Sequence, residues 1–355
     1  MARLFDYEER QREINTYKNP LQRLNGLING EVFRNPIEKA LFVPPKGAGG
    51  RPPYDKIMMF KILILQKYFN LSDEQTEFQI KDRMSFMNFL GLALENTVPD
   101  AKTIWLFREQ ITKSGLIETL FALFLKQLED AHIVMKEGSI VDASFVDAPK
   151  QRNSREENKA IKEGSVPQTF LETDKKGNYS KLAQKDVDAR WTCKNKEVHY
   201  GYKNHIKADA KTKIIVHYTT SSASVHDSKT LKNLVDETDE KVYADSAYRS
   251  ADIEEYLEKN NCESFVHEKG YKNKPLTEEQ KASNKQKSKT RVRVEHIFAF
   301  MTNAMNNGLD NDLYGKYRGQ KRIASSIGLL NLTYNLFRYE QLLRLKIVKP
   351  TINSV

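Results

Sequence analysis

The sequence predicts an α/β domain built on a mixed β-sheet flanked by helices, with an all-helical domain before it and a helical extension after it. From residue 138 onward, the hydrophobic period changes from helical to alternating. The elements then follow in the order strand, hairpin, helix, strand, helix, strand, helix, which is typical of a mixed sheet. Before residue 138, stretches of helical periodicity are separated by turn residues.

A chain of 355 residues is long enough for two or three domains. We predict an N-terminal arm and linker at 1–50, a helical domain at 51–135, the α/β domain at 136–307 with a polar insertion at about 150–197, and a C-terminal helical segment at 308–355.

The composition excludes several classes of protein. Hydrophobic residues make up 39% and aromatic residues 10%, which is enough for packed cores and argues against disorder and against a membrane-embedded chain. The two cysteines lack CxxC spacing, so neither a disulfide framework nor a zinc knuckle is expected. The N-terminus lacks the apolar core of a signal peptide, and we expect a cytoplasmic protein. The net charge of +10 favours a polyanionic partner.

Helix start signals define the predicted helical domain. Asp55 can cap a helix that runs to Phe69, Ser72 and Gln75 form a capping box, and Asp100 can cap a third helix. A Pro- and Gly-rich linker at 44–53 precedes them. The size suits a helix-turn-helix DNA-reading domain, and a dimerisation or packing module is the alternative.

Two short strands of the α/β domain each carry an aspartate. The segment 138–149 alternates as a strand with Asp142 in its middle, and a strand near 241–244 presents Asp245 just before a helix that Ser250 can cap. Between them we expect a polar insertion or mobile loop at 150–196 and a hairpin. Aspartates in buried strands are rare unless they are paired or bind a metal.

A third acid follows a basic stretch. Residues 270–293 are predicted to be a basic loop that leads into a helix carrying Glu295. A surface glutamate paired with Arg291 at i,i+4 spacing is the simplest interpretation of Glu295 alone. This helix is expected to bury one apolar stripe. A C-terminal helix at 319–345 is expected to bury a second stripe. The first stripe is Val294, Ile297, Phe298, Met301 and Met305, and the second is Ile323, Ile327, Leu330, Tyr334 and Phe337.

Asp142, Asp245 and Glu295 together suggest a metal site. Three carboxylates repel one another unless cations separate them, and oxygen ligands favour Mg²⁺ or Mn²⁺ over zinc. Two such ions can activate a water or a 3′-hydroxyl for phosphodiester chemistry. Spacing alone leaves other acids as competitors, namely Asp147, Asp209, Asp227 and Glu263.

Five ordered motifs carry a family resemblance. They are IVDASFVDAP, YGYKNHIKADAKTKII, SVHDSKTL, YADSAYRS and RVRVEHIFAF. Over roughly residues 52–334, the chain resembles the DDE transposases of bacterial insertion sequences, in particular the family named for insertion sequence five. The resemblance implies a ribonuclease H-like catalytic fold, two Mg²⁺ or Mn²⁺ ions, and binding of the inverted-repeat ends of the element.

Carried over by position, Asp142, Asp245 and Glu295 are the catalytic, metal-binding acids, and Arg291 is the arginine four residues before the glutamate. Ser288 and Thr302 depart from the tyrosine and lysine that the family often has at these positions. Further candidates for DNA contacts are basic residues, some of which have structural roles as alternatives: Lys203, His205, Arg249, Lys287, Lys289, Arg293, Arg318, Lys321 and Arg322.

The resulting functional prediction is a transposase that cleaves DNA at the element's ends and joins the 3′-hydroxyl ends to target DNA. Its expected partner is double-stranded DNA, held by a homodimer, with neither a membrane nor a small-molecule substrate involved. A metal-dependent DNA endonuclease without strand transfer and a domesticated DNA-binding protein that no longer cleaves are the alternatives.

Overall fold

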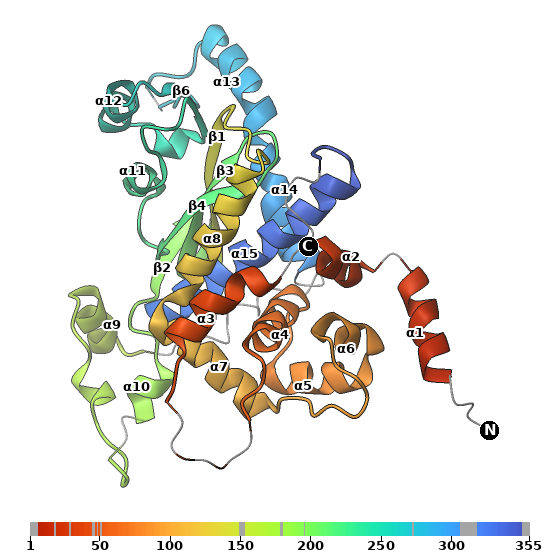
Figure 1. The fold of residues 1–355 in the computed structure, drawn as a ribbon. Helices are drawn as coiled ribbons and strands as arrows, with labels where there is room; N and C mark the ends of the chain where they lie inside the picture. The colour runs from red at the N-terminus through yellow and green to blue at the C-terminus, as the bar shows by residue number, and fades with distance from the viewer. Residues whose placement is uncertain are drawn as a thin grey trace.

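The computed structural model describes residues 6–17, 19–27, 30–44, 47, 49, 52–148, 153–177, 180–194, 196–271, 273–305 and 318–349. The N-terminal helices pack beside a part that contains the β-sheet, and helix α15 lies between them (Figure 1). Much of the predicted linker at 44–53 and the predicted boundary at 307/308 lie outside the described residues.

Among the described residues, six strands form one mixed sheet in the order β2-β3-β1-β5-β6, with β4 also paired to β3. The strands are β1 (Ser139–Asp147), β2 (Arg190–Lys194), β3 (Glu197–Asp209), β4 (Ile215–Ser222), β5 (Lys241–Ala244) and β6 (Glu263–Val266). β3 is antiparallel to β1, β2 and β4, whereas β5 is parallel to β1 and β6 to β5. This confirms the predicted mixed sheet flanked by helices, with its ribonuclease H-like arrangement.

The N-terminal part is helical, as predicted. Its α-helices are α1 (Asp6–Thr16), α2 (Pro20–Leu27), α3 (Arg34–Ala40), α4 (Lys56–Tyr68), α5 (Asp73–Asp82), α6 (Met84–Leu90), α7 (Ala101–Ser114) and α8 (Leu116–Asp130). Asp55, Ser72 and Asp100 cap α4, α5 and α7 through their side chains, and Ser72 forms the predicted capping box with Gln75. Each cap satisfies a backbone N–H that a helix start leaves unpaired.

Helix α15 (Gln320–Arg344) differs from the amphipathic helix that was predicted. The expected stripe from Ile323 to Phe337 is buried, but most of the opposite side is buried as well. The helix packs against α8, α4 and α2 on one side and β4 on the other, so both of its faces are covered. Its polar residues are paired: Asn331 exchanges amide hydrogen bonds with Asn204 (2.9 and 3.1 Å).

Asn335 of α15 bonds to the backbone of Ile215 at the start of β4, accepting from its N–H (2.9 Å) and donating to its carbonyl oxygen (2.8 Å). α15 therefore joins the helical part and the sheet through one core and through buried amides. Within the described residues, no helix is both long enough and apolar enough to cross a membrane.

The predicted polar loop at 150–196 contains regular structure where it is described. Helix α9 (Arg155–Lys162) begins with a capping box between Ser154 and Glu157, α10 (Ser180–Gln184) follows, and β2 pairs with β3. Phe170 is fully buried within this segment. The mobile-loop interpretation is corrected for the described residues, which contain regular structure. These helices were missed because they are short and polar, and α9 buries only Ile161.

The predicted loop at 270–293 is also corrected, since helix α13 (Glu278–Arg291) occupies most of it. A capping box between Thr277 and Gln280 starts the helix, and none of its residues is fully buried, which explains why no hydrophobic period revealed it. Three further helices are α11 (Leu231–Leu234), α12 (Ala251–Lys259), which Ser250 caps as predicted, and α14 (Arg293–Ala299). A π-helical turn, η5 (Phe300–Ala304), continues α14.

Asn335→Ala is expected to lower the free energy of unfolding by about 1–3 kcal/mol, because it leaves the buried N–H and carbonyl of Ile215 unpaired. Urea denaturation measures this change. Gln320→Ala, at the exposed start of the same helix, is the control and should change stability by less than about 0.5 kcal/mol. Equal effects of the two substitutions would contradict the role given to the Asn335 bonds.

Candidate active site

Asp142 and Asp245 lie on neighbouring parallel strands at the same level. Asp142 is in the middle of β1, and Asp245 immediately follows β5. The two strands pair with Ile140 opposite Tyr243. Extending this register by two residues places Asp142 beside Asp245, and residues opposite each other on parallel strands face the same side of the sheet. The pair therefore sits at the carboxyl end of β5, where ligands of such sheets bind.

Asp142 is a desolvated acid. Its side chain is 18% exposed, one oxygen (Oδ1) accepts the N–H of Ala143 at 2.8 Å, and the other (Oδ2) accepts from Nη1 of Arg291 at 3.2 Å. Burial raises the pKa of Asp142 to about 6, and the negative charge of Asp245 adds to this, although the Ala143 amide, Arg291 and Lys194 lower it. The site thus disfavours a second negative charge unless a cation is present.

Asp245 begins a tight turn that brings a buried tyrosine to the site. Its Oδ1 accepts the N–H of Ser246 at 2.6 Å, at the start of the 3₁₀ turn η4 (Ser246–Tyr248). Tyr248 is 1% exposed, and its hydroxyl has no hydrogen-bond partner among the described residues. Burial raises the pKa of Tyr248, and the charges of Asp142, Asp227 and Asp245 act in the same direction. The sequence reasoning missed this residue, although it lies only three positions after Asp245.

Glu295 lies in the first turn of α14, which packs against β1. Val294, Ile297, Met301 and Met305 are buried and Phe298 is partly buried, as the predicted stripe requires. Glu295 itself is 61% exposed, and its Oε1 lies 3.7 Å from Nη2 of Arg291. Arg291 therefore contacts both Glu295 and Asp142. Its hydrogen bond to Asp142 joins residues that are 149 positions apart in the sequence.

The donor set is suited to a hard divalent cation, because all three side chains offer carboxylate oxygens. Asp142 and Asp245 are already neighbours. In the described part of the chain, however, no three acidic, histidine or cysteine side chains are close enough to hold one ion. The guanidinium of Arg291 stands between Asp142 and Glu295, which accounts for the open arrangement.

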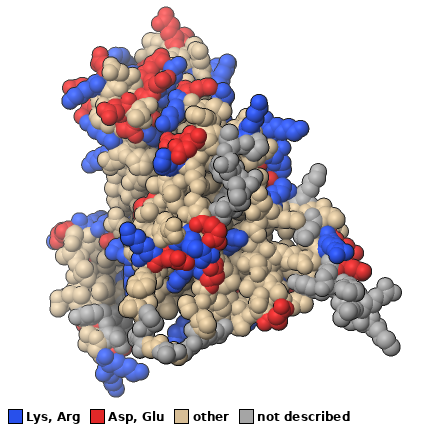
Figure 2. All heavy atoms as spheres, viewed as in Figure 1, with Lys and Arg blue, Asp and Glu red and all other residues tan. Residues whose placement is uncertain are grey.

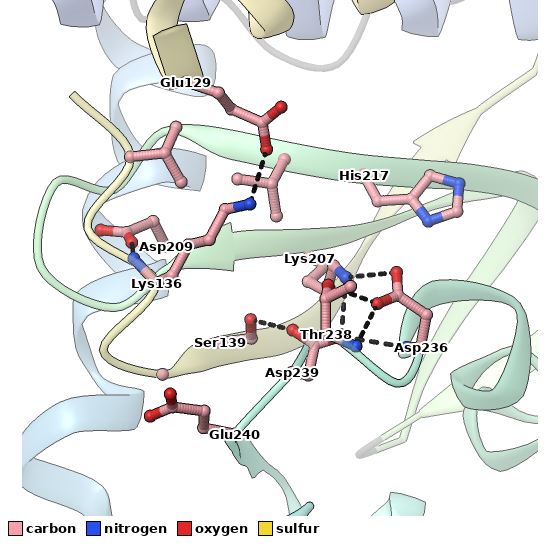
Figure 3. A pocket seen from close by; sticks show the side chains of 13 residues that line it. Glu129, Lys136, Ser139, Lys207, Asp209, His217, Asp236, Thr238, Asp239 and Glu240 are labelled. Atoms are coloured by element: carbon pink, nitrogen blue, oxygen red, sulfur yellow. Dashed lines mark hydrogen bonds and ion pairs between the residues drawn. The ribbon is translucent and has the colours of Figure 1, made fainter. Parts of the chain in front are cut away.

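The competing acids have other contacts. Asp209 accepts backbone N–H groups of Met135, Lys136, Lys211 and Thr212, and it fastens the β3–β4 turn. A separate cavity of about 190 Å³ adjoins it (Figure 3). There, Lys207 is paired with Asp239 at 2.7 Å and with Asp236 at 3.3 Å. The lining of this cavity includes none of Asp142, Asp245 and Glu295, so the cavity is not part of the candidate active site.

Two candidate DNA-contact residues are buried in β3. Nζ of Lys203 donates to Asp227 and to the carbonyl of Val225, both at 2.8 Å. His205 is fully buried, with ring nitrogens 2.8 Å from Ser221 Oγ and 3.2 Å from Thr230 Oγ1, and burial lowers its pKa to about 4. These contacts give both side chains structural roles, and we leave them out of the proposed DNA surface.

Arg249 and Lys287 meet at Glu268, just beyond β6. Arg249 Nη1 lies 2.7 Å and Lys287 Nζ 3.5 Å from Oε1 of Glu268. Asn284 of α13 exchanges hydrogen bonds with the backbone of Glu268 (2.8 and 3.1 Å), and Ser288 Oγ lies 3.3 Å from Nε2 of His267. This set holds α13 against the end of β6. Asn284, His267 and Glu268 were missed, since their relation is visible only once 278–291 is known to be a helix.

The remaining candidates lie at the surface. Lys289, Arg318 and Lys321 are exposed, and Arg293 is exposed while donating to the carbonyl of Ala210 at 2.8 Å. Arg322 is half-exposed and makes a two-point contact with Glu109, with both distances 2.8 Å. Lys289 and Arg293 flank Arg291 in the chain.

Asp142→Asn is expected to stabilise the metal-free protein by up to about 3 kcal/mol at pH 8. The folded-state pKa of Asp142 is about 6, against about 4 in an unfolded chain. The contribution of protonated Asp142 to the stability of the folded protein is therefore full at low pH and is lost as the pH rises through 6. The asparagine removes this loss, so its advantage should be about half as large at pH 5. Urea denaturation at both pH values measures it, and a variant less stable than the wild type at pH 8 would contradict the account of Asp142.

Two family models match this chain. Residues 8–110 match the family model described as "Transposase domain (DUF772)", and residues 135–336 match the one described as "Transposase DDE domain". Among solved structures, the chain is similar to a piggyBac transposase in a synaptic complex with hairpin DNA, with 12% sequence identity, a TM-score of 0.43, and coverage of 95% of this chain and 78% of that one. The match to the DDE domain spans more than half of the residues of this chain, so the chain belongs to the DDE transposases.

Proposed function

We propose that this transposase binds the terminal inverted repeats of an insertion sequence, cleaves the DNA at these ends and joins the freed 3′-hydroxyls to target DNA. Membership of the family supports transposition. One observation carries the site assignment: Arg291 contacts both Glu295 and Asp142, the acid that the register of β1 and β5 puts level with Asp245.

In this proposal, Asp142, Asp245 and Glu295 hold two Mg²⁺ or Mn²⁺ ions. When bound, such ions activate the attacking oxygen and stabilise the leaving oxygen of a phosphodiester. The chain's own contribution is to position the acids. The register between β1 and β5 supports the pairing of the two aspartates, and the buried Val294 and Ile297 anchor α14, the helix that carries Glu295 and packs against β1.

In each of the two proposed steps, the bonds broken, the bonds formed and the protons can be accounted for without a further co-reactant. In cleavage, the oxygen of a water bonds to the phosphorus at the transposon end, the bond from phosphorus to the 3′ oxygen breaks, and that oxygen takes up a proton. In joining, the new 3′ oxygen bonds to a phosphorus of the target strand, and the target's own 3′ oxygen leaves. Cleavage hydrolyses one phosphodiester to a phosphomonoester and a 3′-hydroxyl, whereas joining forms one phosphodiester for the one it breaks and passes the proton of the attacking hydroxyl to the leaving 3′ oxygen. Both steps are displacements at phosphorus, so a single site can serve them.

The charge of α13 supports a DNA strand beside the acids. Lys281, Lys285 and Lys289 are exposed at i,i+4 spacing along the helix, and Arg293, the first residue of α14, is exposed four residues further on. On the face seen in Figure 2, Lys and Arg side chains are interspersed with Asp and Glu over the end formed by α12 and α13. We therefore assign DNA contacts to this row near the acids rather than to the whole end. Since two transposon ends are handled together, we expect a homodimer in the DNA complex.

Asp142→Asn and Glu295→Gln are each expected to reduce Mg²⁺-dependent cleavage of inverted-repeat DNA by at least about 10³-fold while binding of the ends survives, because each removes a proposed metal ligand. Glu263→Gln, which changes an exposed acid on β6, is the matched control and should cleave normally. Gel assays of cleavage and of binding measure the two properties separately. Retained cleavage by Asp142→Asn would rule out the assigned site.

The same assay separates the alternatives when pre-cut 3′-hydroxyl ends and a target plasmid are supplied. A transposase gives joined products. Cleavage without joining would identify a metal-dependent endonuclease, and binding without either reaction would identify a DNA-binding protein that no longer cleaves.

A further inference from the structure

We propose that Arg291 is the internal counter-ion of the active site: it occupies the space between Asp142 and Glu295 in the DNA-free protein and exchanges these carboxylates for a DNA phosphate when divalent ions bind. Arg291 is then a positioning residue that makes metal binding depend on DNA. The inference rests on the proposed function, because it takes Asp142 and Glu295 as metal ligands.

The geometry places one cation between two of the three acids. Nη1 of Arg291 is 3.2 Å from Oδ2 of Asp142, and Nη2 is 3.7 Å from Oε1 of Glu295. The guanidinium carries its positive charge on a planar group that can face two carboxylates at once. The positive charge offsets the repulsion between carboxylates that divalent ions offset in a loaded site.

The contact is incomplete, unlike that of a structural arginine. Arg291 is 21% exposed, and its Nε is buried without a hydrogen-bond partner among the described residues. A buried unpaired donor is destabilising. Arg322, by comparison, binds both oxygens of Glu109 at 2.8 Å. Arg291 therefore has an unused donor that an additional acceptor, such as a phosphate oxygen, would satisfy.

Metal ions and Arg291 compete for the same atoms. Oδ1 of Asp142 already accepts the N–H of Ala143, so Oδ2, the oxygen that binds Arg291, is the one with more capacity for an ion. A divalent ion next to a guanidinium is also repelled by it. Binding of an ion by Asp142 and Glu295 thus requires Arg291 to move away from both.

The position of Arg291 in the chain allows this movement. It is the last residue of α13, separated from α14 by Val292 alone, while Asn284 and Lys287 hold the preceding turns of α13 to Glu268 and Val266. The Arg291 side chain can therefore move away from the acids while α13 stays packed in place. The planar fork of a guanidinium matches two oxygens of a phosphate. Because coupling between two ligands is reciprocal, DNA that captures Arg291 should tighten metal binding, and metal should tighten DNA binding.

The test is the Mn²⁺ affinity of the full-length protein, measured by calorimetry or electron paramagnetic resonance with and without a duplex carrying the inverted repeat. Wild-type protein should bind Mn²⁺ weakly without DNA and more tightly with it. Arg291→Gln should bind Mn²⁺ about tenfold or more tightly without DNA, and DNA should add little, because the competing charge is gone. Arg291→Lys keeps the charge and should remain weak.

Lys126→Gln is the control, because it removes one positive charge from an exposed position of α8, where Lys126 contacts Asp130 and not the three acids. Its Mn²⁺ affinity should equal that of the wild type. Circular dichroism melts establish that each variant is folded before titration. Equal or weaker Mn²⁺ binding by folded Arg291→Gln would overturn the counter-ion role, as would an affinity of the wild type that DNA leaves unchanged.

A double variant separates this failure from failure of the proposed function. Asp142→Asn added to Arg291→Gln should abolish the tight Mn²⁺ binding. If tight binding survives in the double variant, then Asp142 is not a ligand, and both the site assignment and the inference are wrong. If Asp142→Asn abolishes Mn²⁺ binding but Arg291→Gln never tightens it, the site assignment stands and only the counter-ion role is lost.

Discussion

Repulsion between carboxylates is the constraint around which this protein is arranged. Parallel pairing of β1 and β5 places Asp142 and Asp245 side by side, and burial makes the charge of Asp142 costly enough to raise its pKa to about 6. Such an arrangement persists only if the rest of the fold imposes it. Arg291 relieves part of the repulsion by contacting Asp142 and Glu295, and the proposed metal ions would relieve it further.

The surrounding elements explain how the site is held. α15 is buried on both faces and joins the N-terminal helices to the sheet, with Asn331 and Asn335 satisfying polar groups of β3 and β4. On the other side, Glu268 and Asn284 fasten α13 to the end of β6. Arg291 is the last residue of that helix. The hydrogen bonds that hold α13 in place therefore also position Arg291 beside the acids.

Sequence reasoning was sufficient for the sheet and for several helix starts. The strands with Asp142 and Asp245, the hairpin of β3 and β4, and the side-chain caps at Asp55, Ser72 and Asp100 all follow from local periodicity and capping chemistry. The polar helices α9 and α13 could not be found in this way, because neither has a continuous apolar face. Local sequence also could not show that α15 is covered on both faces, since that depends on which elements pack around it.

The acids themselves were identified by resemblance more than by spacing, and their arrangement required the structure. Nothing in the sequence distinguishes an Arg291 that contacts only Glu295 four residues away from one that also reaches Asp142. Likewise, the buried positions of Lys203 and His205 depend on partners such as Asp227 and Thr230 that lie 24 or 25 residues further along the chain.

The most direct measurement is an experimental structure of the protein bound to inverted-repeat DNA and Mn²⁺, with the ions located by anomalous scattering. The account predicts ions coordinated by Asp142, Asp245 and Glu295 at the carboxyl end of β5, with Arg291 turned from the acids to a DNA phosphate. Ions bound to other acids, or an Arg291 that still bridges Asp142 and Glu295 with the ions in place, would contradict it.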